Sequence, residues 1–220
     1  MVRRAFLFCA FTLTATAGVA ADLRGFVSEG AAGVLQFQFC NGSVLGRELF
    51  PIEDKTPNGA LRQGVGAVRQ IMLRRYQPLY VEARGERGKT NATVYQFQRA
   101  LGTVESCKAL PRDIQSNVRL LATGQAPAWR LVVTDATALL ELPDRVSMKL
   151  PAAAFKAAGT DQMAKETLPR AYDLQSADGT PVRVEISPQM CTDGRSETAY
   201  GARVQVRSGA RRLEGCAARF

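Results

Sequence analysis

Residues 189–217 read QMCTDGRSETAYGARVQVRSGARRLEGCA and place two cysteines, Cys191 and Cys216, around two turns and an alternating run. The segments TDG and RSGA are rich in turn residues, and ARVQVRS alternates apolar and polar side chains as a half-buried strand does. The stretch therefore predicts antiparallel strands beside a pair of thiols. These thiols either bind each other or hold a metal or redox centre, and that choice decides how the chain is built.

Four cysteines remain once Cys9, in the N-terminal apolar run, is set aside: Cys40, Cys107, Cys191 and Cys216. An even number of cysteines in an exported chain predicts disulfides. Four thiols allow three pairings and the sequence does not choose among them, although sequential pairing is favoured if the chain divides between the pairs. The chain has no histidine and no C-x-x-C pair, so we expect no metal and no cofactor.

The N-terminus, MVRRAFLFCAFTLTATAGVAAD, has the pattern of a secretory signal peptide over residues 1–21. Two arginines precede an apolar run that ends in small residues, and the run is shorter than the ~20 residues of a spanning helix. Phe8 precedes Cys9, where a lipoprotein would have a small residue. We therefore expect a periplasmic protein that is neither a lipoprotein nor membrane-spanning after cleavage.

The chain is basic, with a formal net charge of +9. Loss of Arg3 and Arg4 with the signal peptide lowers the net charge by two. A basic surface attracts polyanions, and export favours anionic envelope polymers or lipid headgroups over nucleic acid as partners. The other interpretation is that the charge serves solubility alone.

Residues 22–112 are expected to form a first domain that is mainly β with one helix. The run GVLQFQFC (33–40) alternates as a half-buried strand does, and further strands are expected in RELFPI (47–52), PLYVEARGER (78–87) and TVYQFQRALGTV (93–104). The segment GALRQGVGAVRQIMLRRY (59–76) sets apolar residues at helical spacing: Leu61, Val65, Val68, Met72 and Leu73. This order of elements is typical of a small OB-like barrel.

Residues 113–220 are expected to form a second, disulfide-stapled domain. Short β-like runs follow one another, parted by turn signals such as SADGTP, and predict an antiparallel barrel or sandwich. The Ala-rich stretch from Ala152 to Ala164 is expected to be a short helix or a loop. The fold class is thus mainly β, in two small antiparallel β-barrel or sandwich domains.

The C-terminal half carries GQAPAW (124–129), CTDGRS (191–196) followed by a tyrosine, and LEGC (213–216). These resemble the G-x-E-P-x-W, C-S-D-G-M-S and L-x-G-C motifs of a family of largely uncharacterised bacterial periplasmic and envelope proteins. The N-terminal half is loosely similar to the OB-type domain of NlpE-like envelope proteins. The positions that match are Gly124, Pro127, Trp129, Cys191, Asp193, Gly194, Ser196, Tyr200, Leu213, Gly215 and Cys216, whereas Ala126 and Arg195 replace the family's acidic residue and methionine.

Five of these C-terminal positions form a candidate binding patch: Trp129, Asp193, Arg195, Ser196 and Tyr200. Asp193 can accept backbone N–H bonds in the TDG turn. Trp129, the only tryptophan, is either a core residue with its indole N–H bonded or a platform for ligand stacking. Arg195 and Tyr200 are the polar side chains best placed for surface contacts.

Catalysis is not expected. Without histidine the chain cannot form Ser-His-Asp or Cys-His sites. Glu82, Glu86, Asp193 and Glu197 show no spacing that marks a carboxylate pair, and we expect them to be solvated. The lysines lie among polar or turn residues, and none stands out as a desolvated amine: Lys89, Lys108, Lys149, Lys156 and Lys165.

The sequence therefore predicts a non-catalytic periplasmic envelope protein, a binding or structural module for an unknown envelope component. One alternative is an inhibitor of a cell-wall-degrading enzyme such as lysozyme, with residues 196–200 as the contact. A second is an envelope hydrolase that uses paired carboxylates. A third is a copper-handling protein, in which Met190 and a reduced Cys191 would bind copper(I).

Overall fold

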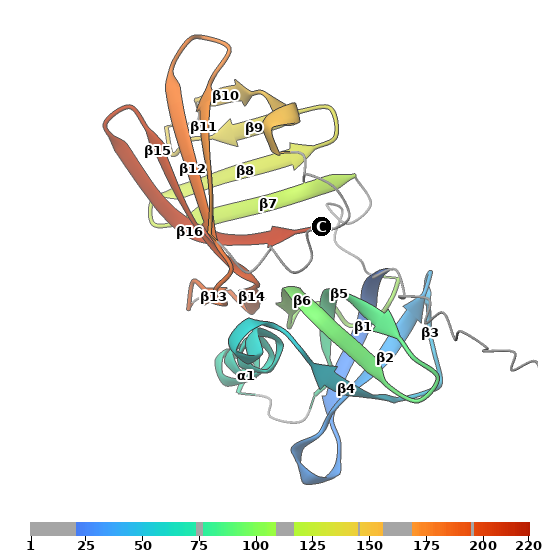
Figure 1. Cartoon of the computed structure of the whole chain (residues 1–220). Coiled ribbons are helices and arrows are strands. Elements are labelled where there is room, and N and C mark those ends of the chain that lie inside the picture. Colours follow the sequence, from blue (N-terminus) through green and yellow to red (C-terminus); the bar gives the residue numbers. More distant parts are fainter. Residues whose placement is uncertain (1–20, 74–76, 109–116, 145, 156–168, 195) are drawn as a thin grey trace, which may run out of the picture.

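The computed structural model describes residues 21–73, 77–108, 117–144, 146–155, 169–194 and 196–220. These residues form two β-sheets and one α-helix, and the two sheets lie one above the other (Figure 1). The prediction of a mainly β chain with two compact antiparallel β structures is confirmed. The expected signal peptide lies almost wholly in residues 1–20, outside the described part.

Five strands of the first sheet close into a barrel-like ring. β1 pairs with β2 and β5, β2 with β4, β4 with β6, and β6 with β5; only the β4–β6 pair is parallel. The two-residue strand β3 pairs with β2. The bounds are β1 (Ala21–Glu29), β2 (Leu35–Asn41), β3 (Val44–Leu45), β4 (Phe50–Asp54), β5 (Leu79–Arg87) and β6 (Ala92–Leu101).

Every second side chain of β2 points into the interior of this ring, as the alternation in the sequence predicts. Leu35, Phe37 and Phe39 are buried, and the residues between them are partly exposed. The Phe39 ring lies 4.6 Å from that of Phe37 and 5.2 Å from that of Phe50. Burial of such apolar area, at roughly 25 cal/mol per Å², is the main term that stabilises the ring.

The helix α1 (Ala60–Met72) closes one side of the ring and packs on β6. Its buried stripe contains Leu61, Val65 and Val68, in agreement with the helical spacing. The sequence predicts that Leu73 continues the stripe, and this is wrong. Leu73 caps the helix with a φ of 54°, and it is 89% exposed. The left-handed residue turns the chain away from the helix axis, so the side chain leaves the core.

The second sheet has eight antiparallel strands in the order β10-β9-β8-β7-β16-β15-β12-β11. One apolar core includes side chains from all eight of its strands, directly or packed against its edge. The β10 end reaches the β11–β12 turn, where Ala177 N donates to Lys149 O at 3.1 Å. The sheet is therefore strongly curled. Its strands are β7 (Val118–Gln125), β8 (Ala128–Thr134), β9 (Ala138–Glu141), β10 (Ser147–Leu150), β11 (Arg170–Gln175), β12 (Pro181–Ser187), β15 (Ala202–Ser208) and β16 (Arg211–Arg219).

The short 3-10 helix η4 (Ala152–Phe155) covers the open side of this curl. It contacts β8 and β11, and its Phe155 ring lies 4.9 Å from the Tyr172 ring. The expected Ala-rich helix thus begins as a single short turn. Residues 156–168, which include Lys156 and Lys165, lie outside the described residues.

Two strands from the C-terminal half belong to the first sheet. β13 (Cys191–Thr192) pairs with β14 (Thr198–Tyr200), and β14 pairs with β6. The chain then passes through Gly201 directly into β15 of the second sheet. The sequence interpretation had placed all of 113–220 in one domain, and its boundary at 112/113 falls within residues 109–116, outside the described residues.

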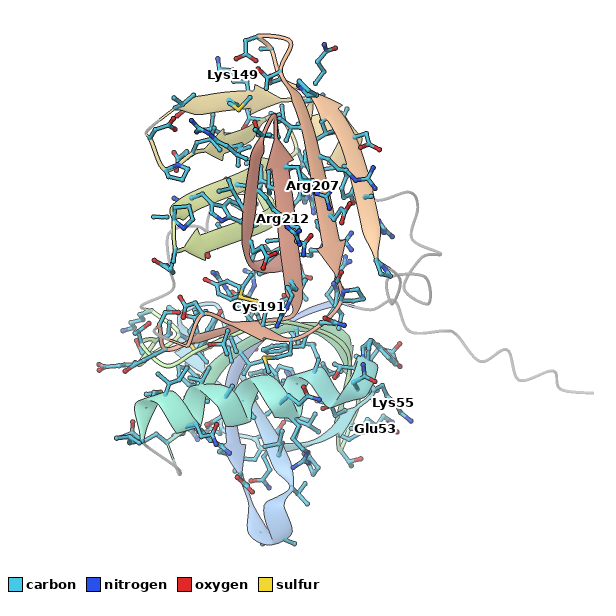
Figure 2. The ribbon with its side chains drawn as sticks, turned by 90° about the vertical axis from the view of Figure 1, so that its left-hand side faces the viewer. Glu53, Lys55, Lys149, Cys191, Arg207 and Arg212 are labelled. Carbon is cyan, nitrogen blue, oxygen red and sulfur yellow. A yellow bond between two sulfur atoms is a disulfide. The ribbon has the colours of Figure 1, made fainter. Side chains whose placement is uncertain are left out.

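Both disulfides join the cysteines in sequential order, and the prediction that the cysteines form bridges is confirmed. Cys40–Cys107 covers the outer face of the ring beside Phe26, Tyr80 and Leu101. Cys191–Cys216 connects β13 of the first sheet to β16 of the second, and Figure 2 shows Cys191 where the two sheets meet.

Candidate functional site

The outer face of β5 is buried as well as its inner face. Leu79, Val81 and Ala83 point into the ring, so the residues between them should face water. Tyr80 and Glu82 are nevertheless fully buried, at 0% exposure. Tyr80 packs against Phe26, Leu101, Val104 and Cys107 of the N-terminal half, and the neighbouring strand β6 contacts β16 at the junction between the two sheets.

A buried ion pair lies in this junction. Glu82 and Arg99 are register partners on β5 and β6, and Arg99 Nε donates to Glu82 Oε2 at 2.7 Å. Tyr80 Oη donates to Glu82 Oε1 at 3.1 Å. The Arg99 guanidinium lies 5.0 Å from the ring centre of Phe220, the residue that follows β16. The expectation that Glu82 is solvated is therefore wrong, because its carboxylate is buried and bonded to Arg99 and Tyr80.

This environment also changes the acidity of the Tyr80 phenol. Burial raises its pKa, and the negative charge of Glu82 and the hydrogen bond to it raise the pKa further. The phenol therefore stays a hydrogen-bond donor over the physiological pH range. All three polar groups have partners, so the cluster is a structural support for the site beside it.

Beside the ion pair lies a cavity of about 420 Å³ whose lining comes from both sheets. Its volume falls within the ~300–1,000 Å³ that is common for small-molecule sites. The first sheet contributes two residues and the second sheet, with η4 and the chain end, contributes the rest. The lining residues are Arg84, Gln96, Arg119, Leu120, Val133, Thr134, Asp135, Ala152, Phe155, Tyr172, Ile186, Arg219 and Phe220.

The charged part of this lining has three arginine side chains and one carboxylate side chain. Arg119 forms two bonds to Asp135, Nε to Oδ1 at 2.8 Å and Nη2 to Oδ2 at 3.0 Å, and both side chains are more than half exposed. Arg84 Nε lies 3.4 Å from Asp22 Oδ1, and the side chain is 34% exposed. The cavity therefore presents several guanidinium N–H donors to a ligand.

Two polar atoms of the lining residues are buried and form no hydrogen bond within the described part of the chain: Gln96 Oε1, and Arg84 Nε, which has the ion-pair contact with Asp22. Buried polar groups in native proteins are nearly always bonded, so each such atom calls for a partner. The remainder of the wall is apolar and includes Leu120, Val133 and Ile186. The cavity combines a buried acceptor that forms no hydrogen bond, Gln96 Oε1, with a surface for an apolar ligand body.

The predicted binding patch does not lie in this cavity. Trp129 is 4% exposed, and its Nε1 donates to Glu214 O at 3.1 Å within the core of the second sheet. Asp193 Oδ1 accepts bonds from Ser196 N at 2.7 Å and Ser196 Oγ at 2.9 Å, and so closes the β13–β14 turn. Tyr200 pairs with Cys191 and Arg99 in the first sheet. Arg195 is outside the described residues.

The remaining chemical candidates can also be located. Cys191 is bonded to Cys216, and therefore offers no thiolate to copper(I) while the bridge is intact. The described residues hold no group of three or more His, Cys, Asp or Glu side chains able to bind a metal ion. None of the helices in the described ranges has the length and apolarity needed to cross a bilayer.

Comparison of the chain with protein-family models, curated proteins and solved structures finds no match. The resemblance to an envelope family therefore stays a prediction. Sequence reasoning missed the cavity, because its arginines are scattered from position 84 to 219 and each resembles an ordinary surface residue. The near-continuous apolar run at the start of β5 was the one signal that this strand is covered on both faces.

Proposed function

We propose that this chain is a non-catalytic binding protein of the bacterial envelope that holds a small ligand at the junction of its two sheets. The observation that carries this proposal is the 420 Å³ cavity lined by residues of both sheets. Two features support it as a stable site. The Cys191–Cys216 bridge fixes the sheets to each other, and the buried Glu82–Arg99 pair lies beside the cavity.

We propose further that the first ring is an OB-type domain. Its five strands follow the order β1-β2-β4-β6-β5 and return to β1, with α1 between the third and fourth strands. This is the connectivity expected of a five-stranded Greek-key barrel of that type. OB domains commonly bind ligands on their second and third strands, whereas the cavity here is lined by Arg84 and Gln96 from the fourth and fifth.

The periplasm is the proposed location. The signal-like residues 1–21 support export, and two disulfides are compatible with an oxidising compartment. The likeness of the C-terminal motifs to envelope proteins points to the same place. The alternative of a lysozyme inhibitor is less well supported, because its contact segment, residues 196–200, includes β14, which pairs with β13 and β6 within the first sheet.

The proposal is tested by comparing ligand retention in a variant whose cavity is filled by a large side chain with retention in a control variant whose cavity is left open. The protein, exported from a bacterial host and purified from the periplasm, is incubated with a low-molecular-weight envelope extract, washed and analysed by native mass spectrometry. Ala152 lines the cavity, so Ala152→Trp should fill it, whereas Ala210→Trp places the same ring in an exposed turn between β15 and β16.

The wild-type and Ala210→Trp proteins should retain the same bound mass, and Ala152→Trp should lose it. Equal retention by the two variants would remove the cavity as the binding site. A wild-type protein that retains nothing from the extract would refute the binding function itself.

A further inference from the structure

We infer that the cavity binds a small organic oxyanion, a molecule with one anionic group and a compact apolar or aromatic body. This inference rests on the proposed function and specifies the ligand class. It follows from the charged and the apolar residues that line this one cavity.

The anionic group is indicated by the arginines. Arg84, Arg119 and Arg219 line the cavity, and two carboxylates accompany them: Asp135, bonded to Arg119, and Asp22, 3.4 Å from Arg84 Nε. A guanidinium has five N–H donors, more than the two that Asp135 takes from Arg119. Arginine binds carboxylate, phosphate and sulfonate oxygens in pairs of parallel bonds, and such charge-assisted bonds are stronger than neutral ones. A guanidinium has no acceptor atom, so the N–H groups that these carboxylates leave unused can bond an anion but not a cation.

The apolar body is indicated by the aromatic and aliphatic residues of the lining. Phe155, Tyr172 and Phe220 contribute aromatic surface, and Leu120, Val133 and Ile186 contribute aliphatic surface. Phe155 and Tyr172 already contact each other at 4.9 Å between ring centres, so their surface is preorganised. An inorganic anion would leave this surface in contact with water, whereas a ligand with a hydrophobic body would bury it.

Gln96 adds a requirement for polarity on the ligand or on a bound water. Its Oε1 is buried without a partner, and it belongs to the wall contributed by β6. A ligand N–H or O–H, or a bridging water, would satisfy this acceptor. The three features together define an amphiphilic anion of the size of a small aromatic or short-chain acid.

Two fluorescent probes separate the anionic from the apolar contribution. Anilinonaphthalene sulfonate carries a sulfonate, and phenylnaphthylamine has the same aromatic body without it. Titration of the disulfide-bonded full protein with each probe gives the affinity and the number of sites. We expect one site for the sulfonate probe and at least tenfold weaker binding of the neutral probe.

Arginine variants then locate the anionic group. Arg119→Gln should weaken the sulfonate probe about tenfold, as expected when a charge-assisted bond worth roughly 1.4 kcal/mol is lost, and should leave the neutral probe unchanged. The variant should fold, because the Arg119–Asp135 pair is more than half exposed. Arg207→Gln is the matched control: it makes the same charge change on β15 at an exposed position away from the lining (Figure 2).

Equal affinity for the two probes, or equal loss in Arg119→Gln and Arg207→Gln, would overturn the oxyanion inference. Persistence of sulfonate binding in Ala152→Trp would also overturn it, because the probe would then lie elsewhere. If these titrations fail while the wild-type protein still retains an extract component that Ala152→Trp loses, the ligand class is wrong and the proposed function stands.

The anion could reach the cavity as a free acid or as part of a lipid. Co-sedimentation with phosphatidylglycerol and phosphatidylcholine vesicles, each with and without excess of the sulfonate probe, distinguishes the two sources. We expect a free acid, since the lining encloses only about 420 Å³, and therefore no co-sedimentation with either vesicle. Co-sedimentation with phosphatidylglycerol that the probe displaces would contradict the free acid and assign the anionic group to a lipid headgroup.

Discussion

Cys191 and Cys216 lie 5.4 Å apart between their Cα atoms and are bonded, although their strands belong to different sheets. Cys191 begins the β13–β14 hairpin, which extends the first sheet beside β6. Cys216 lies on β16, in the middle of the second sheet. The bridge therefore connects the two halves of the molecule next to the place where the chain itself crosses between them.

Removing this bridge should loosen the junction. The double substitution Cys191→Ser with Cys216→Ser should lower the free energy of unfolding by about 3–4 kcal/mol, the chain-entropy value for a loop of this length. Denaturant unfolding measures the loss, and hydrogen exchange should rise first in β14 and β6. Unchanged exchange in these strands would show that the bridge does not hold the sheets together.

The Glu82–Arg99 pair should show the asymmetry of a buried ion pair. Glu82→Gln or Arg99→Met alone should lower the free energy of unfolding by roughly 3–5 kcal/mol, because each leaves a buried charge without its partner. The double variant Glu82→Gln with Arg99→Met should recover part of this loss. Denaturant unfolding of the wild type and the three variants gives the coupling free energy.

The control for this cycle is the exposed Arg183–Asp173 pair, with N–O distances of 2.8 and 2.9 Å. Asp173→Asn should change the stability by less than about 1 kcal/mol. Additive effects of the Glu82 and Arg99 substitutions would contradict a direct interaction between them.

Tyr80 should make the stability depend on pH at the alkaline end. Its pKa is raised in the folded protein, so the unfolded state loses the phenol proton first as the pH rises above about 10. The stabilising contribution is thus complete below that pH and is lost above it. Tyr80→Phe should have a shallower alkaline decline in unfolding free energy than wild type, and should lose about 1–3 kcal/mol at pH 7 with the bond to Glu82. If the unfolding free energies of wild type and Tyr80→Phe fell equally with pH above about 10, a raised pKa of Tyr80 would be refuted.

The chain passes from β14 of the first sheet to β15 of the second at Gly201, and this passage should require glycine. A Cβ there would lie 1.7 Å from the backbone oxygen of Phe97, so Gly201→Ala should separate β14 from β6 and destabilise the fold by several times the ~1 kcal/mol of an average substitution. Gly66 is the matched control, since a Cβ there meets nothing within 4 Å and the site lies within α1. Gly66→Ala should raise the melting temperature, because alanine favours a helix by ~0.5–1 kcal/mol. Equal changes in the melting temperature of the two variants would contradict the close contact between position 201 and the backbone of Phe97.

Much of the fold follows from local patterns. Alternation in 33–40 predicts β2 and its buried face, and the spacing of Leu61, Val65 and Val68 predicts α1. A period-2 pattern states that one face of a strand is buried but does not identify the neighbouring strand. For this reason the sequence predicts turns and strands around Cys191 but assigns them to the second domain, whereas β14 pairs with β6 of the first sheet.

The candidate site could not be predicted for a related reason. Glu82 looks solvated in the sequence, but in the folded chain it is fully buried and pairs with Arg99 on the neighbouring strand β6. The cavity combines Arg84 from β5 with Arg119 from β7, and neither side chain belongs to a motif. Sites built from side chains on two sheets leave no local signal, whereas the turn bonds of Asp193 to Ser196 follow from the local TDG sequence.

Peptide mapping of the non-reduced, exported protein tests the central claim most directly, namely that an oxidised bridge joins the two sheets beside the cavity. We predict one linked peptide that contains Cys191 and Cys216 and a second that contains Cys40 and Cys107. A link between Cys107 and Cys191, or four free thiols, would contradict the account.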